Sequence, residues 1–195
     1  MNRSAARYPS VCAALLLALC ATTARAETYQ VDLIVFTQSG SEAGRPARVP
    51  DLTRAVDPEA TASLRNFGIR VLPEGTGGLE TMWHRLANGR RYTPLKRLSW
   101  IQTDPPESRG PALHITGGAT IDTPTGTLRG LDGTVALYAG HYLHLDTDLV
   151  WTQRGADGQP VSWRLKEDRS LRRDELNYLD SPRLGVLVKV SKAGG

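Results

Sequence analysis

The sequence predicts an α+β domain, built as a mainly antiparallel sheet with one or two helices packed on one face. Two observations predict it. Segments in which apolar and polar residues alternate account for most of the chain, and only one segment has strong helical periodicity. The composition, with 40% hydrophobic and 23% charged residues, is that of a globular protein and excludes a fully disordered or collagen-like chain.

The first 26 residues have the three parts of a cleaved secretory signal. Arg3 and Arg7 precede the apolar run 11–20, and Ala24 and Ala26 supply the small residues that precede a cleavage site. The apolar run is too short to span a bilayer as a stable anchor. We therefore expect cleavage after Ala26 and export to the periplasm, with no transmembrane anchor in the mature chain.

A lipoprotein signal ending at Cys20 is the alternative reading of this segment. Signals of that kind take a small residue directly before the cysteine, whereas this chain has Leu19 there. The cleaved secretory signal is therefore favoured.

Cleavage changes the charge and the chemistry of the chain. The full sequence has 24 Lys and Arg against 20 Asp and Glu, and loss of Arg3, Arg7 and Arg25 leaves 21 against 20, a net charge of +1. Cys12 and Cys20 are lost as well. We expect a mature chain without a disulfide or a reactive thiol, and its near-neutral charge gives no reason to expect nucleic-acid binding.

Residues 27–195 are expected to form a single domain. Residues 38–57, rich in Ser, Gly, Pro and scattered charges, are expected to form a long flexible loop. The alternating run 135–151 is either one long bent strand or two strands folded near Gly140. The expected strands are 28–37, 92–102, 112–116, 135–151, 161–165 and 184–190, and helices are expected at 78–88 and, in a shorter form, ending near Asn66.

One cluster of side chains has the composition of a chemical site. His141, His144, Asp146 and Asp148 lie within eight residues of the run 135–151. A metal-dependent or carboxylate hydrolase using His144, Asp146 and Asp148 is one interpretation. Against it, residues along one face of a strand diverge, and metal sites usually draw their ligands from several elements.

A ladder of charged pairs across two strands is the favoured interpretation of the same cluster. If Trp151 pairs with Val161 in an antiparallel hairpin, each acid meets a base and the imidazole meets a carboxylate. The expected pairs are Asp148 with Arg164, Asp146 with Lys166, and His144 with Asp168.

Basic residues recur along the segment 164–173, and tyrosines lie near it in the expected fold. They form either a solvated face or a binding surface for an anionic, sugar-containing polymer, on which tyrosine rings offer flat apolar contacts. The candidate binding residues are Tyr142, His144, Arg164, Lys166, Arg169, Arg172 and Tyr178. The chain lacks a Gly-x-Ser-x-Gly elbow, a phosphate loop and a His-Glu-x-x-His motif, so we expect no catalytic residues, no metal and no cofactor.

Three blocks of sequence carry a resemblance to a known family. They are 29–36 (YQVDLIVF), 142–149 (YLHLDTDL) and 172–188, which contains Glu-Leu-x-Tyr-Leu-Asp-x-Pro-x-x-Gly-Val-Leu-Val. Their order and spacing resemble the CsiV-type family of periplasmic peptidoglycan-binding proteins. The chain departs from the family at Asn177 and Ser181, where the family often has histidine.

The resemblance implies a non-catalytic envelope protein that binds peptidoglycan and supports cell-wall synthesis or cell shape. It further implies work beside an outer-membrane lipoprotein that activates penicillin-binding synthases. Two other interpretations stay open, the periplasmic hydrolase with the His/Asp cluster and an adaptor that binds only a protein partner.

Overall fold

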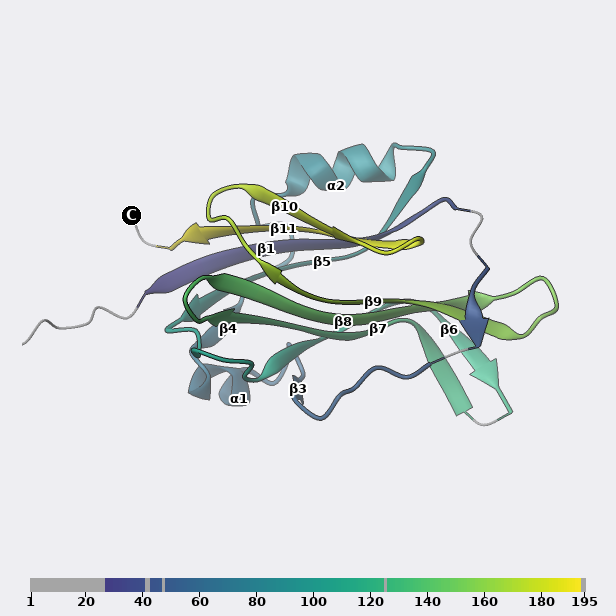
Figure 1. Ribbon diagram of the computed structural model, residues 1–195, viewed down its shortest axis with the longest axis horizontal. Helices are drawn as coiled ribbons and strands as arrows, with labels where there is room; N and C mark the ends of the chain where they lie inside the picture. The colour runs from purple at the N-terminus through teal and green to yellow at the C-terminus, as the bar shows by residue number, and fades with distance from the viewer. Residues whose placement is uncertain (1–26, 41–42, 47, 125, 194–195) are drawn as a thin grey trace, which may run out of the picture.

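The structure is a computed structural model that describes residues 27–40, 43–46, 48–124 and 126–193. The expected signal segment, its cleavage site after Ala26 and both cysteines lie outside the described residues. Within the described part, the chain forms two sheets that pack face to face, and helix α2 (Glu80–Ala87) covers the outer face of one of them (Figure 1).

The first sheet has five strands in the order β10-β11-β1-β5-β4, and all its pairings are antiparallel. Its central strand β1 is buried on both faces, and towards its C-terminal end both faces are apolar because each is covered. Leu33 and its inward neighbours enter the main core, whereas Ile34 and Phe36 pack against Leu79 beside helix α2. The strands are β1 (Thr28–Gln38), β4 (Ile69–Val71), β5 (Tyr92–Thr103), β10 (Leu176–Asp180) and β11 (Leu184–Lys192).

The second sheet has six strands in the order β2-β9-β8-β7-β6-β3. Strands β7 and β8 approach closely at Gly133, where φ is +152° and an added Cβ would lie 2.1 Å from the Asp148 carbonyl oxygen. Glycine is therefore required at this position. The strands are β2 (Arg45–Pro46), β3 (Ala55–Val56), β6 (Ala112–Thr123), β7 (Gly126–Ala139), β8 (Leu143–Arg154) and β9 (Pro160–Ser170).

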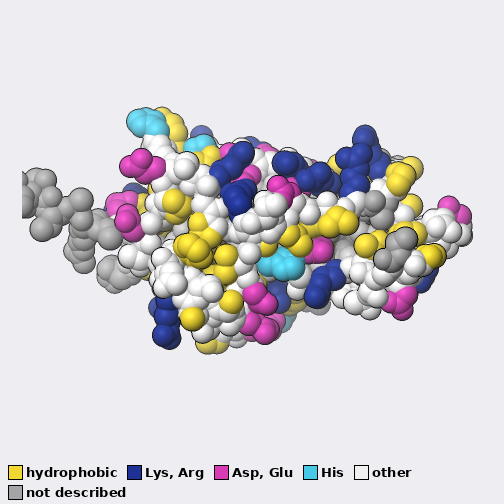
Figure 2. Space-filling view, turned by 90° about the horizontal axis from the view of Figure 1, so that it is seen from below, with side chains coloured by type: hydrophobic (Ala, Val, Ile, Leu, Met, Phe, Trp, Pro, Cys, Tyr) yellow, Lys and Arg dark blue, Asp and Glu magenta, His cyan; other side chains and the backbone are white. Residues whose placement is uncertain are grey.

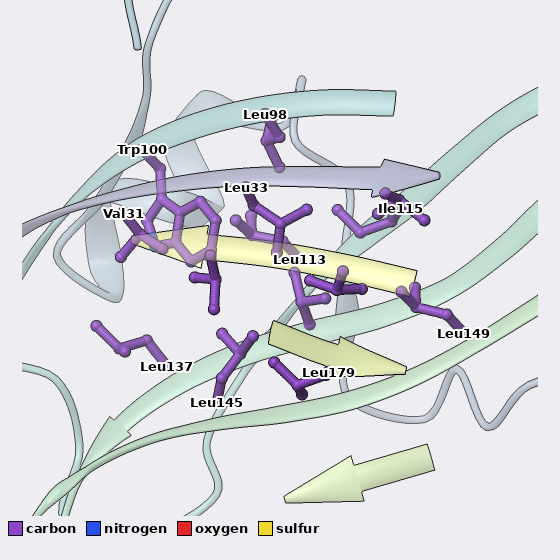
Figure 3. Close-up of a cluster of buried hydrophobic side chains, with 14 of the residues drawn as sticks. Val31, Leu33, Leu98, Trp100, Leu113, Ile115, Leu137, Leu145, Leu149 and Leu179 are labelled. Atoms are coloured by element: carbon purple, nitrogen blue, oxygen red, sulfur yellow. The ribbon is translucent and has the colours of Figure 1, made fainter. Parts of the chain in front are cut away.

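The main hydrophobic core lies between the two sheets. Side chains from both sheets point towards one another there, among them Trp100 and Leu179 from the first sheet and Leu145 and Leu149 from the second (Figure 3). Each fully buried leucine of this kind contributes about 1.5–3 kcal/mol to folding. Helix α1 (Thr61–Asn66) adds Leu64 to the same core and packs beside β4.

The fold class is confirmed in its coarse form, since the protein is mostly antiparallel sheet with two short helices. The expectation of one sheet with its helices on one face is wrong. The strands divide into two sheets, because the apolar face of each sheet has to be covered by the apolar face of the other. The two helices are not on one face either, since α1 and α2 contribute to different hydrophobic clusters. The alternating run is two strands that fold near Gly140, as one of the two alternatives predicted.

The interval 38–57, expected to be one long loop, contains two short strands at opposite edges of the six-stranded sheet. Because β2 pairs with β9 and β3 pairs with β6, the segment 48–54, which we call the strap, has to cross the sheet. It crosses the outer face, since the inner face is filled by the core. Val150 and Thr152 point outward yet are only 1% and 5% exposed, and they line a hollow together with Arg48, Val49 and Pro50.

Candidate functional site

Three of the predicted binding residues share the outer face of the six-stranded sheet. His144 lies on β8 and Arg164 and Lys166 lie on β9, and the neighbours Leu145 and Leu165 point the other way, into the core. These three residues therefore lie on one surface, as expected from their alternation along the strands.

The other four predicted residues are dispersed. Tyr142 lies in the turn between β7 and β8, 62% exposed, with its ring against His141. Arg169 is near the end of β9 and Arg172 follows it in the connection to β10. Tyr178 stacks on Phe36 with 6.2 Å between ring centroids, so it lies on the outer face of the other sheet, on the same side as α2.

Strands β8 and β9 pair two residues away from the expected register. Trp151 is opposite Trp163 instead of Val161. Because the shift is by two residues, the same side chains stay on the outer face. Diagonal contacts then form two of the three expected pairs: Arg164 donates two hydrogen bonds to Asp148 (2.6 and 2.5 Å), and His144 Nδ1 lies 3.1 Å from Asp168.

The third expected pair, Asp146 with Lys166, is not formed. In the observed register Asp146 is directly opposite Asp168, an unfavourable arrangement of like charges. Arg109, from the connection between β5 and β6, lies 3.3 Å from Asp146 and 2.7 Å from Asp168 and so joins the two carboxylates. Arg54 of the strap donates to Asp146 at 2.8 Å, whereas Lys166 lies 3.8 Å from Asp148.

Asp168 is the centre of a network of polar side chains on this face. The hydroxyl of Tyr138 donates to it at 2.7 Å, and the Tyr138 ring stacks on His144 at 4.8 Å. Burial disfavours the charged carboxylate, but hydrogen bonds from Tyr138, Arg109 and His144 outweigh that effect and lower the pKa of Asp168. Burial and the bond to Asp168 raise the pKa of Tyr138. Asp168 is thus an ionised acceptor at neutral pH.

The predicted basic strip is neutralised by neighbouring acids. Arg164 and Lys166 both contact Asp148. Arg169 lies 2.7 Å from Glu167 and Arg172 lies 3.7 Å from Glu175. These cations therefore do not present a row of unopposed positive charge.

Among the residues that the structure describes, arginines without an acidic partner lie beside β9, at the β2 end of the strap. A hollow of about 290 Å³, which we call the arginine hollow, is lined by Ala43, Arg45, Arg48, Ser162, Trp163, Arg164 and Pro182. No described residue places a carboxylate within ion-pair distance of the Arg45 or Arg48 guanidinium. Figure 2, which shows the molecule from below, has many of its Lys and Arg side chains along the upper half, and others lower down near Asp and Glu side chains.

The wall of the arginine hollow is fixed by stacked planar groups. Trp163 lies against Trp151 with 5.1 Å between ring centroids, and the Arg183 guanidinium lies 4.9 Å from the Trp163 ring. Arg183 also donates to the Gln38 and Gly40 carbonyls, both at 2.9 Å. A tryptophan held between such partners forms a rigid surface.

Comparison with known proteins identifies the family. The model of the CsiV peptidoglycan-binding protein family matches residues 11–193. The chain belongs to the CsiV family. The match confirms the resemblance carried by the three sequence blocks, and the family's description as peptidoglycan-binding supports a binding role for this chain.

Other comparisons add little to the CsiV assignment. No curated protein matches the chain. A solved structure, ExeD of Aeromonas hydrophila, is similar over 87% of this chain and 49% of its own, at 9% sequence identity and a TM-score of 0.34, which is too low to carry an argument. The chain spans about half the length of that protein. Among the described residues, none belongs to a helix with the length and apolarity needed to cross a membrane.

The His/Asp cluster of this CsiV-family chain does not converge on one point. His144 pairs with Asp168, Asp146 pairs with two arginines, and Asp148 pairs with Arg164. In the part of the chain that the structure describes, no three His, Cys, Asp or Glu side chains are placed to share a metal ion. The three residues of the hydrolase interpretation therefore each contact a different partner among the described residues.

Sequence reasoning missed Arg45, Arg48 and Arg109. Arg45 lies in the two-residue strand β2 and the other two lie in connections, so no local periodicity places them beside β8 or β9. One signal was present, since residues 43–50 contain two arginines and no acid. Their position on the six-stranded sheet follows only from the path of the strap.

Proposed function

We propose that this CsiV-family chain is a non-catalytic periplasmic protein that binds peptidoglycan and supports cell-wall synthesis or cell-shape maintenance. The observation that carries the proposal is the family match over residues 11–193. The separate pairing of His144, Asp146 and Asp148 supports the non-catalytic part, because acid-base chemistry needs groups that reach one substrate.

We assign the polymer contact to the outer face of the six-stranded sheet, along β9. Lys166 is 64% exposed there, and Tyr138 and His144 present a stacked pair of rings beside it. Such a mixture of hydrogen-bonding groups and flat rings suits sugars with attached peptides. In the proposal, Arg164 continues this surface, and Arg172 and Tyr142 lie at its end. Arg169 and Tyr178 are left out, because Arg169 is opposite Leu145 on the inner side of β9 and Tyr178 is on the outer face of the other sheet.

Sedimentation with isolated sacculi tests the proposal. The mature protein should pellet with sacculi, and Lys166→Glu should weaken pelleting several-fold at low salt and less at high salt, because exposed charges are screened. Arg70→Glu is the matched control, since it makes the same charge change on strand β4 of the other sheet. A wild-type protein that stays in the supernatant at low and physiological salt would overturn the proposal.

The same supernatants test the non-catalytic part of the proposal. Muropeptide release should stay at the level of untreated sacculi between pH 5 and 8, and release that Asp146→Ala abolishes would restore the hydrolase interpretation. The proposed protein partner is an outer-membrane lipoprotein activator of a penicillin-binding synthase. Crosslinking to it should need no peptidoglycan, and failure to crosslink with or without sacculi would remove the partner from the proposal.

A further inference from the structure

We propose that the arginine hollow binds a carboxylate group of the peptide stems of peptidoglycan. The inference rests on the proposed function and adds a specific site and a chemical class of ligand to it. Peptidoglycan carries its negatively charged groups on its peptides, and these groups are carboxylates.

The charges around the hollow select an anion. Arg45 and Arg48 have no carboxylate of a described residue within ion-pair distance, so within the described part of the chain two positive charges on this rim lack an acidic partner. Arg164 is the third guanidinium of the lining, and its two hydrogen bonds to Asp148 hold it in one orientation. Guanidinium groups match carboxylates through paired hydrogen bonds, which gives this lining a preference for a planar anion.

The hollow is small, so only a small group of the polymer can enter it. Its volume of about 290 Å³ lies at the lower limit of pockets that enclose a drug-sized ligand, and a water molecule occupies roughly 30 Å³ of bulk liquid. The end of a peptide stem fits such a space, whereas a disaccharide does not. Trp163 and Pro182 give the hollow an apolar wall for the side chain of that residue. The glycan then lies outside the hollow, on the face next to β9.

The backbone is anchored to β9 at each of the two arginines. Strand β2 pairs with Val161 and Ser162 of β9, and the Arg48 N–H donates to Ser162 Oγ at 3.2 Å. An added Cβ at Gly44 would lie 2.7 Å from the Val161 Cβ, so glycine is what permits this close approach. Fixing the backbone before the ligand arrives lowers the entropy that binding must remove.

The test compares sacculus binding by variants that remove the same charge. Arg45→Gln and Arg48→Gln should each weaken binding about tenfold at physiological salt, the effect of losing one charge-assisted contact. Arg70→Gln, which removes an exposed charge on β4, should bind like the wild type. Arg48→Lys should recover only part of the affinity, because an ammonium lacks the planar fork. Since neither the Arg45 nor the Arg48 guanidinium has a described acidic partner, thermal unfolding of these variants should match the wild type.

Chemical modification of the sacculi gives a second arm that does not depend on the variants. Amidation of the stem carboxylates with a carbodiimide and methylamine should lower wild-type binding to the level of Arg48→Gln and remove the difference between them. If the wild type pellets equally well with amidated sacculi, or the Arg45→Gln/Arg48→Gln double variant binds like Arg70→Gln, the inference is wrong while the proposed function stands. If the wild type does not pellet with native sacculi, the proposed function itself fails.

Discussion

Asp168 receives hydrogen bonds from three separate parts of the chain. Tyr138 of β7, His144 of β8 and Arg109 of the β5–β6 connection all contact its carboxylate. Together they hold the pKa of Asp168 below its ordinary value of 3.8 in spite of partial burial. A carboxylate whose pKa is lowered by folding stabilises the folded state as long as it is ionised.

Asp168→Asn should lower the free energy of unfolding at pH 7 by about 1 kcal/mol, the cost of weakened charge-assisted bonds at a partly exposed site. The difference in free energy of unfolding between the wild type and the variant should have its full size above pH 3.8. It should shrink to zero as the pH falls through the lowered pKa of Asp168, because the wild-type side chain then becomes neutral, like that of the variant. Urea unfolding at several pH values measures it. Asp157→Asn, in the β8–β9 loop, is the control; a gap that stays constant down to pH 2 would contradict the explanation.

For single residues, the sequence predicts which face of the sheet a charged side chain occupies, but it does not predict every residue that the side chain contacts. Alternation along β8 and β9 correctly placed His144 and Arg164 on the outer face. The register was wrong by two residues, because a shift of two leaves the alternation unchanged. Arg54 and Arg109 reach Asp146 from connections more than thirty residues away in sequence, which no local pattern encodes.

The strap is the element that decides which part of the outer face is available. It is tied at one end by the pairing of β2 with β9 and at the other by β3 and by Arg54, which also donates to the Gly110 carbonyl. It covers Val150 and Thr152 and leaves the arginine hollow at its β2 end.

Gly44→Ala should loosen the β2 end of the strap without unfolding the protein. The added Cβ would lie 2.7 Å from the Val161 Cβ, so β2 must move away from β9, while the main core is untouched. Trypsin should then cleave after Arg48 several times faster than in the wild type. Cleavage after Arg91, in the exposed connection after α2, serves as the internal reference. An unchanged rate after Arg48 would show that β2 accommodates the methyl group where it lies.

The elements that the sequence predicted are those long enough to show a period. Strands β1, β5, β8 and β11 and helix α2 were found near their observed bounds. Strands β2, β3 and β4 have two or three residues each, so no alternation can be seen in them. No strand was expected over β10, because its five residues are too few to show a clear alternation and lie shortly before Pro182.

In the whole molecule, the first and the last strand of the chain are neighbours in one sheet. Strand β11, the last in the chain, lies between β10 and β1 in the five-stranded sheet, and β1 is the first strand. Val186, Val188 and Val190 of β11 are fully buried. The sheet can therefore be completed only after almost the whole chain is available, and most of its contacts are between residues distant in sequence.

A chain that ends at Asp180 should fail to fold. It lacks β11, so β1 loses one of its two partners, β10 loses its only strand partner within the described sheet, and three buried valines are missing. We expect no cooperative thermal transition and no near-ultraviolet circular dichroism from this chain. A chain that ends at Ala193 is the control and should unfold like the full mature protein. A cooperative transition in the shorter chain would show that the six-stranded sheet is stable by itself.

The division into two sheets could not be derived from the alternation alone. A period of two shows that one face of a strand is buried, but not which other sheet covers it. The sequence does contain a sign of the central position of β1, since Ile34 and Phe36 are apolar residues on its second face. These two residues indicate that both faces of β1 are covered, but they do not identify α2 as the element that covers the second face.

The stacked indoles of Trp151 and Trp163 also give the protein an optical property. Two identical chromophores 5.1 Å apart, held with 29° between their planes, share their excited states and produce paired bands of opposite sign in circular dichroism. One chromophore forms part of the wall of the arginine hollow and the other lies behind it. The intensity of that couplet depends on the geometry of the wall, so it is a label-free spectroscopic gauge of whether a substitution such as Gly44→Ala, whose added Cβ would lie 3.0 Å from the Trp163 ring, leaves the two indoles in place.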